Sequence, residues 1–196
     1  MSRLQTSFVL GYHGCDKSVG MKIVNGQAFF TPSHEEYDWL GGGIYFWEND
    51  PARAREWAEQ KVRIGAYREP FVVGAVIDLA NCLDLRTLED AVLVKDFHTA
   101  FCRAQKKAGL PIPKNKNPKN QHGRDLVMRY LDCAVINYLH SLVDTKSPHA
   151  RFDTVRALFW EGKPLYPGSG FKAKTHTQIA VRTDDCIKGV FIPRQI

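Results

Sequence analysis

The order of the apolar segments along the chain constrains its fold more than any other feature of the sequence. Six short runs are rich in β-forming residues, and they cover positions 8–14, 44–47, 71–79, 155–160, 178–182 and 187–192. Between the third and fourth runs, the stretches 88–108 and 124–143 carry apolar residues at helical spacing instead. Strands early, helices in the middle and strands late favour an α+β fold over a doubly wound sheet.

The length and the helix-start signals indicate one domain with an insertion. A chain of 196 residues suits a single domain and can bury a substantial core. Asp50 followed by Pro51 is a strong helix start, and Asp16 is suited to cap a short helix over 16–25. We expect one domain over residues 1–196, with the helical middle, about 87–150, inserted into a β scaffold.

The hydropathy pattern bears on where the protein works. Apolar content of 44% and charged content of 24% are ordinary for a globular chain. No apolar run approaches the ~20 residues of a membrane-spanning helix. The first residues, Met-Ser-Arg-Leu-Gln-Thr, lack the profile of a secretory signal. These features predict a cytoplasmic protein with no membrane partner.

The five cysteines are scattered and show no Cys-x-x-Cys spacing. This pattern argues against a disulfide framework and against a structural zinc site, so we predict no metal. Cys15 directly follows His13-Gly14, which is compatible with a nucleophile. No base is identifiable by spacing, however, and a structural or ligand-lining role is favoured.

The net charge of +6 favours an anionic partner, such as a nucleic acid or a phosphorylated small molecule. A Pro/Asn-rich segment contributes Lys114, Lys116 and Lys119, which form a candidate anion contact. Charge runs in loops of this kind are most often only solvated.

Two short motifs place functional groups at the ends of strands. Tyr12-His13-Gly14 offers an imidazole, which can donate to a ribose hydroxyl, and a bare backbone that a flat amide can reach. The glycines at 41–43 lack the lysine of a P-loop and precede a strand, so they indicate close backbone approach or positive φ. On the strand that follows, Tyr45 is either packed in the core or presents its ring to a planar ligand.

Taken in order, these motifs resemble the ADP-ribosyltransferase superfamily. The residues that carry the resemblance are Tyr12-His13-Gly14, Ile23, Gly26, the run 41–46, Ala52, Ala54 and Trp57. They are most similar to the branch of diphtheria toxin and the poly(ADP-ribose) polymerases, whose active site is a His–Tyr–Glu triad. The resemblance covers residues 8–60 well and 176–192 loosely. It implies a split β-sheet core with flanking helices, and NAD as the co-substrate.

The resemblance also assigns an NAD site. His13 matches the triad histidine that holds the adenosine ribose, and Gly14 matches the glycine whose backbone grips the nicotinamide carboxamide. Tyr45 matches the triad tyrosine beside the nicotinamide, and Trp57 takes the place of a second stacking aromatic. Ala54 stands where the family often has a serine for the carboxamide, so that bond is absent or supplied elsewhere. The full NAD-binding set implied is Tyr12, His13, Gly14, Gly43, Tyr45, Ala54 and Trp57.

The third triad position departs from the family. Gln178, in the run Thr-Gln-Ile-Ala-Val, occupies it in place of glutamate, and completes a catalytic set with His13 and Tyr45. An amide oxygen still accepts a hydrogen bond from the ribose 2′-hydroxyl, but it supplies no charge to an oxocarbenium-like transition state. Gln178 therefore indicates mono-ADP-ribosyl transfer, or a slow or inactive relative. Glu161 is an alternative source of the carboxylate, although a solvated acid at a turn is favoured for it.

The segment before Gln178 lies where the family keeps its target-recognition loop. It combines an aromatic ring with cations, which suits a nucleobase or an anionic protein surface, and a loop without a role is equally compatible. The substrate-binding residues expected there are Phe171, Lys172, Lys174 and His176.

Three functions follow from these observations. The first is an NAD-dependent mono-ADP-ribosyltransferase acting on a macromolecule, with RNA or DNA favoured over protein. Compact transferases of this kind resemble bacterial toxins or phage-defence effectors, for which a neutralising partner protein is expected. The second is a module that binds NAD or ADP-ribose without catalysis. The third, ranked last, is an NAD-dependent RNA 2′-phosphotransferase, which needs arginines grouped around a phosphate; those available are Arg53, Arg63, Arg124 and Arg182.

Overall fold

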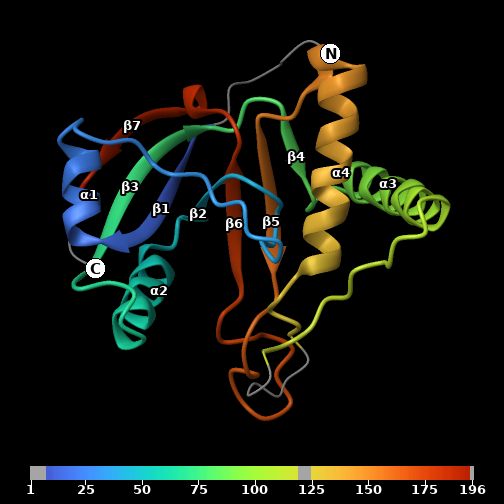
Figure 1. Ribbon diagram of the computed structural model, residues 1–196. Coiled ribbons are helices and arrows are strands. Elements are labelled where there is room, and N and C mark those ends of the chain that lie inside the picture. Colours follow the sequence, from blue (N-terminus) through green and yellow to red (C-terminus); the bar gives the residue numbers. More distant parts are fainter. Residues whose placement is uncertain (1–7, 119–124, 195–196) are drawn as a thin grey trace.

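The structure is a computed structural model that describes residues 8–118 and 125–194. Within these residues the chain forms four α-helices, two short 3-10 helices and seven strands (Figure 1). In chain order they are β1 (Phe8–Asp16), α1 (Lys17–Val24), β2 (Ile44–Glu48), α2 (Pro51–Arg63), β3 (Pro70–Asp78), β4 (Cys82–Asp84), α3 (Leu88–Lys107), α4 (Tyr130–Lys146), η1 (Pro148–Ala150), β5 (Thr154–Phe159), β6 (His176–Val181), η2 (Asp184–Cys186) and β7 (Ile187–Phe191).

The seven strands form one mixed sheet in the order β4-β5-β6-β2-β1-β3-β7. Neighbouring strands are antiparallel except β4 and β5, which are parallel. The α+β class predicted from the order of the apolar segments is therefore confirmed. The sequence pattern did not predict β4, because its three residues are too few to show a periodicity.

In the middle of the sheet, β1 and β2 pair over only a short length. β1 pairs with β3 along its whole length, from Phe8 to Asp16. In contrast, β1 meets β2 in two residue pairs, Gly11 with Glu48 and Tyr12 with Trp47. Beyond Tyr12 the pairing of β1 with β2 stops. The sheet therefore consists of two ladders, β4-β5-β6-β2 and β1-β3-β7, and we call the two residue pairs that join them the seam.

Each face of the sheet is covered by different elements. On one face, α1 and the segment after it pack Ile23 and Phe30 against the strands. On the other face, α4 packs Ile136 and Leu139 over the β4–β5–β6 part, while α2 packs Ala54 over the β1–β3 part. Figure 1 shows α1 and α2 beside the β1–β3 half and α3 and α4 beside the β4–β5 half.

The predicted helix starts are confirmed at three of four places, and α3 begins at Leu88 as predicted. The Asp16 carboxylate accepts from the Ser18 N–H at the start of α1, and Asp50 precedes Pro51 and caps α2. The helix predicted from residue 124 begins at Tyr130 instead. Its first N–H groups donate to the Asn115 side chain, a cap that comes from a distant segment and leaves no local signal.

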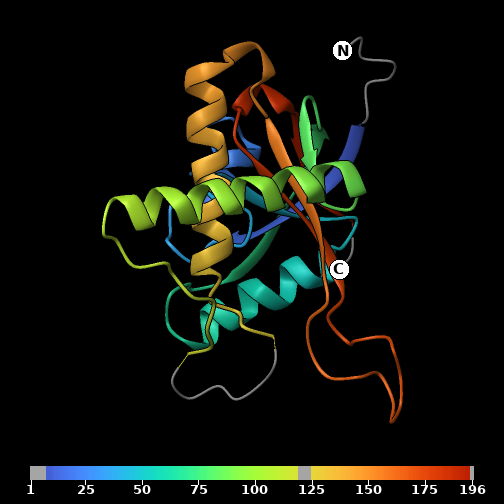
Figure 2. The ribbon, with the colours of Figure 1, turned by 90° about the vertical axis from the view of Figure 1, so that its right-hand side faces the viewer.

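α3 packs on α4 and, at its C-terminal end, extends away from the sheet (Figure 2). α3 contacts α4 through Phe101 and Tyr138, whose ring centroids lie 5.5 Å apart. Past this contact, the C-terminal end of α3 projects beyond α4 (Figure 2). The chain then returns through residues 110–118, which lie exposed or half-buried.

Candidate active site

A cavity of ≈ 430 Å³ lies between β1 and β2, the two strands that separate beyond their short seam. Its lining comes from β1, β2, α2 and β6, from the segment before β2, and from residues near 118, 127 and 161. The cavity lies within the size range of small-molecule sites. Segments from both ends of the chain therefore converge on one concave surface.

Seven of the residues predicted for NAD, catalysis or substrate binding line this cavity. They are His13, Gly14, Gly43, Tyr45, Trp57, Lys174 and Gln178. These seven residues were predicted from the order and spacing of short motifs, and the fold brings them together around one cavity.

The His13 ring is oriented by the backbone of the neighbouring strand. Its Nδ1 lies 2.8 Å from the Tyr45 carbonyl oxygen, which can only accept, so Nδ1 carries the proton. Burial lowers the pKa of His13, against the opposing effect of the hydrogen bond to Tyr45. A neutral ring in this tautomer presents the Nε2 lone pair, so His13 is suited to accept a hydrogen bond from a ligand hydroxyl. The sequence predicted instead that the ring would donate a hydrogen bond.

Gly14 lies against α2 so closely that no side chain fits. A Cβ built at this position would lie 2.3 Å from the Ala54 carbonyl oxygen and 3.3 Å from Cδ1 of Trp57. Glycine is needed at position 14 because β1 and α2 approach each other this closely. The backbone of Gly14 is thereby left bare beside the indole of Trp57.

Tyr45 presents its ring to the cavity while its hydroxyl is held elsewhere. The hydroxyl accepts from the Leu40 N–H at 2.8 Å and donates to the Gly41 carbonyl at 2.7 Å. Burial raises the pKa of Tyr45, which keeps the phenol protonated. The hydroxyl fixes the glycine turn, and the ring is left as a flat surface.

Two tryptophans continue this surface. Trp47 is buried, and its ring centroid lies 5.9 Å from that of Trp57, which is 37% exposed. We call the uncharged surface made by His13, Gly14, Tyr45, Trp47 and Trp57 the neutral wall. It offers planar rings and bare backbone, which suit a flat heteroaromatic ligand.

Charged and amide side chains form another part of the lining, which we call the ionic wall: Arg53, Glu161, Lys174 and Gln178. Arg53 donates to the Glu161 carboxylate at 3.0 Å, and the Glu161 side chain is 21% exposed. The sequence favoured a solvated acid for Glu161, whereas the structure places it in the cavity beside a cation. On β6, Gln178 lies next to Trp47 of β2 and Ala157 of β5.

Two buried donors of the cavity lack a partner among the described residues. They are the indole N–H of Trp47 and the Nε–H of Arg53. Buried donors are nearly always satisfied by protein, water or ligand. Both atoms are enclosed by protein, so neither is exposed to a molecule that enters the cavity.

Five of the predicted residues do not line the cavity. Tyr12 packs its ring edge-on to Phe191, and Ala54 is fully buried beneath Gly14. Lys172 pairs with Asp125, while Phe171 is 68% exposed on the loop. His176 is buried under the cavity, where its Nδ1 donates to the Lys174 carbonyl and its ring stacks on Trp39. These five residues therefore do not face the cavity.

The segment before β2 supplies lining residues that the sequence reasoning missed. They are Thr31, Ser33, Tyr37, Asp38 and Trp39. No role was predicted for this stretch from the sequence, although the aromatic residues just before the glycine triplet were a usable signal. The pairing of Arg53 with Glu161 could not be foreseen, since their separation along the chain is too large for any local pattern.

Cys15 is not a nucleophile of this site. It is buried at 4% exposure, and burial raises its pKa to about 11. It does not line the cavity, so the structural role favoured from the sequence holds. Among residues 8–118 and 125–194, no three His, Cys, Asp or Glu side chains are grouped as metal ligands.

No protein-family model matches the chain, and no curated protein or solved structure matches it. In the part of the chain that the structure describes, no helix combines the length and the apolar character that crossing a membrane requires.

Proposed function

We propose that this protein is an NAD-dependent mono-ADP-ribosyltransferase whose acceptor is a nucleic acid. The observation that carries the proposal is the convergence of His13, Gly14, Tyr45, Trp57 and Gln178 on one cavity. These residues were selected by resemblance to the His–Tyr–Glu branch, without knowledge of the fold. The two ladders joined by a short seam also agree with a split-sheet core.

The residues present fit the two halves of NAD differently. The neutral wall suits the nicotinamide, whose ring would stack near Tyr45 and Trp57 and whose carboxamide would reach the Gly14 backbone. The Nε2 lone pair of His13 suits a ribose hydroxyl. The Lys174 ammonium, which belongs to the lining of the cavity, suits acceptor oxygens such as those of the diphosphate.

The reaction breaks the bond between the nicotinamide nitrogen and ribose C1′. Nicotinamide leaves with the bonding electrons, and positive charge develops at C1′ and the ring oxygen. The acceptor atom then bonds to C1′ and loses its proton. The products are nicotinamide, one proton and the ADP-ribosylated acceptor.

Glu161 supplies the charge that Gln178 lacks. Gln178 offers an amide oxygen to the ribose 2′-hydroxyl, and Glu161 places a carboxylate on the same wall to stabilise the developing positive charge. Electrostatic stabilisation of this kind is usually the largest catalytic contribution. Arg53 holds the Glu161 carboxylate in place through its 3.0 Å hydrogen bond.

The test is incubation with labelled NAD and separate samples of RNA, DNA and protein, with nicotinamide release measured in parallel. Label transfer to a nucleic acid by the wild type, and its loss in His13→Ala, are the expected results. If the wild type transfers no label, releases no nicotinamide and matches His13→Ala, the proposal is wrong.

The second candidate is a module that binds NAD or ADP-ribose without catalysis. The uncharged Gln178 at the triad position favours it. Calorimetry that detects NAD binding in the absence of any nicotinamide release would select this function. The 2′-phosphotransferase alternative stays last. Of its four arginines, Arg124 lies outside the described residues. Of the other three, only Arg53 lines the cavity, and Arg182 pairs with Asp144.

A further inference from the structure

Most of the net charge of the protein is concentrated in one projecting segment. Residues 95–116, which we call the basic arm, contain six Lys or Arg and one acid, whereas the whole chain has a net charge of +6. The arm comprises the C-terminal part of α3 and the return segment, and it extends away from the sheet (Figure 2). Its cations are Lys95, Arg103, Lys106, Lys107, Lys114 and Lys116, all exposed.

The cations of the arm lie unpaired along one segment of the described chain. Among the described residues, none of the six makes an ion pair. In contrast, Arg156 pairs with Glu48, Lys172 with Asp125 and Arg182 with Asp144. Unpaired like charges in one segment create a positive potential that attracts a polyanion.

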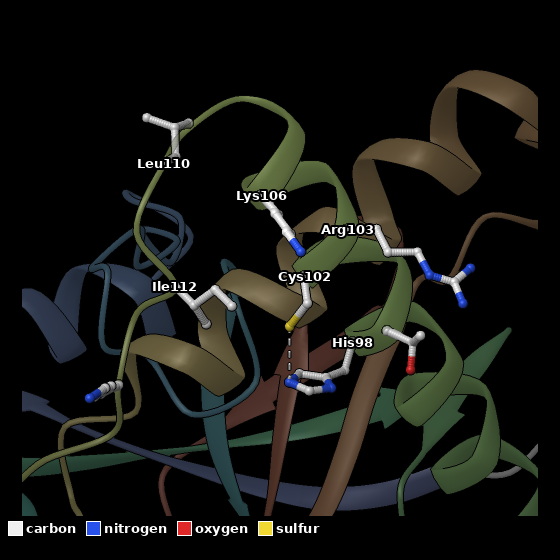
Figure 3. Close-up of a pocket in the computed structure, with 8 residues that line it drawn as sticks. His98, Cys102, Arg103, Lys106, Leu110 and Ile112 are labelled. Atoms are coloured by element: carbon white, nitrogen blue, oxygen red, sulfur yellow. Dashed lines mark hydrogen bonds between the residues drawn. The ribbon is translucent and has the colours of Figure 1, made fainter.

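The arm also forms an open groove of ≈ 760 Å³. Figure 3 shows it between α3 and the segment that carries Leu110 and Ile112, with the Lys106 ammonium directed between them. Arg103 and Lys114 also border the groove. Apolar side chains flanked by cations provide contacts for both the sugars and the phosphates of a nucleic acid strand.

The groove, a second depression and the cavity are neighbours on the surface. His98 borders both the groove and the second depression, which has a volume of ≈ 530 Å³. That depression is lined by Lys95, Arg129 and Trp160, and it shares Trp39 with the cavity. The depression therefore lies between the arm and the candidate active site, with Trp39 at its border with the cavity.

Cations and aromatic rings lie close together around the second depression. Trp160 is 62% exposed in the second depression, and the Arg129 guanidinium lies 4.9 Å from the Trp39 ring centroid. Proteins bind single-stranded nucleic acid through a positive groove that follows the backbone and aromatic side chains on which bases stack.

We propose that the basic arm and the second depression bind a single-stranded nucleic acid and direct it into the cavity. This inference rests on the proposed function, since it supplies the acceptor of that reaction. The phosphates lie along Lys95, Arg103, Lys106 and Lys114, and a base stacks on Trp160. A single strand is favoured over a duplex because paired bases keep their faces in the stack and cannot reach an enclosed site.

The test measures binding of a fluorescent mixed-sequence 20-nucleotide single strand by anisotropy over a series of salt concentrations, without NAD. The arm variant combines Arg103→Ala, Lys106→Ala and Lys114→Ala. The matched control combines Lys22→Ala, Arg63→Ala and Lys188→Ala, which removes the same charges from exposed positions on α1, α2 and β7. The control distinguishes a local site from an effect of net charge.

The arm variant is expected to bind the oligonucleotide roughly tenfold more weakly or worse, with a plot of log K against log [salt] whose slope is smaller by about two. The control is expected to lose less than about threefold. Trp160→Ala is expected to weaken binding about tenfold without altering the salt slope, because it removes stacking rather than a phosphate contact.

Equal binding by the arm variant and the control would overturn the inference. So would a duplex bound more tightly than the single strand, or an acidic polypeptide such as poly-glutamate bound as tightly, because the arm would then serve a different partner. NAD binding is measured separately by calorimetry. Loss of oligonucleotide binding in the arm variant supports the inference even if no NAD binds, in which case the proposed function fails alone.

Discussion

The neutral wall and the ionic wall of the cavity are held in place by different forces. On the neutral wall, side chains are oriented by the main chain: His13 by the Tyr45 carbonyl, and Tyr45 by Leu40 and Gly41. On the ionic wall, side chains orient one another. Arg53 bonds to Glu161, and both Arg53 and Lys174 bond to Glu56.

This difference separates two properties that a substitution can change. A change on the neutral wall alters the shape that a ligand meets, so it affects binding. A change on the ionic wall alters the charge at the reacting atoms, so it affects the rate. Kinetic and binding measurements on the same variants can therefore test whether the division is real.

The largest effect is expected from Glu161→Gln. The amide keeps the shape of the side chain and removes its charge, so nicotinamide release should fall about 10²–10³-fold while the NAD dissociation constant changes less than about threefold. Single-turnover release and calorimetry measure the two quantities.

Glu56→Gln is the matched control for that experiment. Glu56 bonds to Arg53 and Lys174 but does not line the cavity. Its loss should lower the rate far less than the loss of Glu161. Equal rates in wild type and Glu161→Gln would show that the reaction does not use this carboxylate.

On the neutral wall, Gly14→Ala should weaken NAD binding about 10- to 100-fold. The added Cβ meets the Ala54 carbonyl at 2.3 Å, and either the strand or α2 must shift. Gly170→Ala is the control, since its Cβ would have no neighbour within 4 Å and its φ is not positive. Calorimetry measures both variants, and unchanged affinity in Gly14→Ala would contradict the assigned role of that backbone.

A smaller effect is expected when charge is added to the ionic wall. Gln178→Glu restores the carboxylate of the family triad and should raise nicotinamide release about tenfold. Gln60→Glu adds the same charge elsewhere in the lining and should leave the rate nearly unchanged. If both variants behave alike, position 178 has no special relation to the reacting atoms.

The sequence predicted the neutral wall better than the ionic wall. His13, Gly14, Tyr45 and Trp57 belong to short motifs in which a few neighbouring residues carry the signal, and their spacing along the chain is informative. Strand and helix positions were predicted for the same reason, because hydrophobic periodicity and caps such as Asp16 and Asp50 are local.

The residues that were missed depend on contacts across the fold. Arg53 and Glu161 form a pair only because α2 and the end of β5 approach the same cavity. Asn115 caps α4 from an earlier segment, which displaced the predicted helix start. A single sequence carries no record of such pairings, whereas the spacing of a strand-end motif is visible directly.

The smallest effect concerns the pH dependence of NAD binding, and it tests the neutral wall without changing its shape. Burial lowers the pKa of His13 from the ordinary value of 6.5, so the ring stays neutral and keeps its Nε2 acceptor to a lower pH than an ordinary histidine does. The loss of affinity between pH 8 and pH 6 should therefore be smaller than that of a histidine with the ordinary pKa. A histidine with the ordinary pKa would be about three-quarters protonated at pH 6 and would lose about fourfold in affinity.

His13→Gln is the control for this titration, because an amide accepts a hydrogen bond without titrating. Its affinity should not show the loss that protonation of His13 causes in the wild type. A fourfold loss in the wild type between pH 8 and pH 6, absent from His13→Gln, would mean that His13 has an ordinary pKa. That result would contradict the burial of the His13 ring. Its centroid lies 5.2 Å from that of Phe30 and 5.7 Å from that of Phe46.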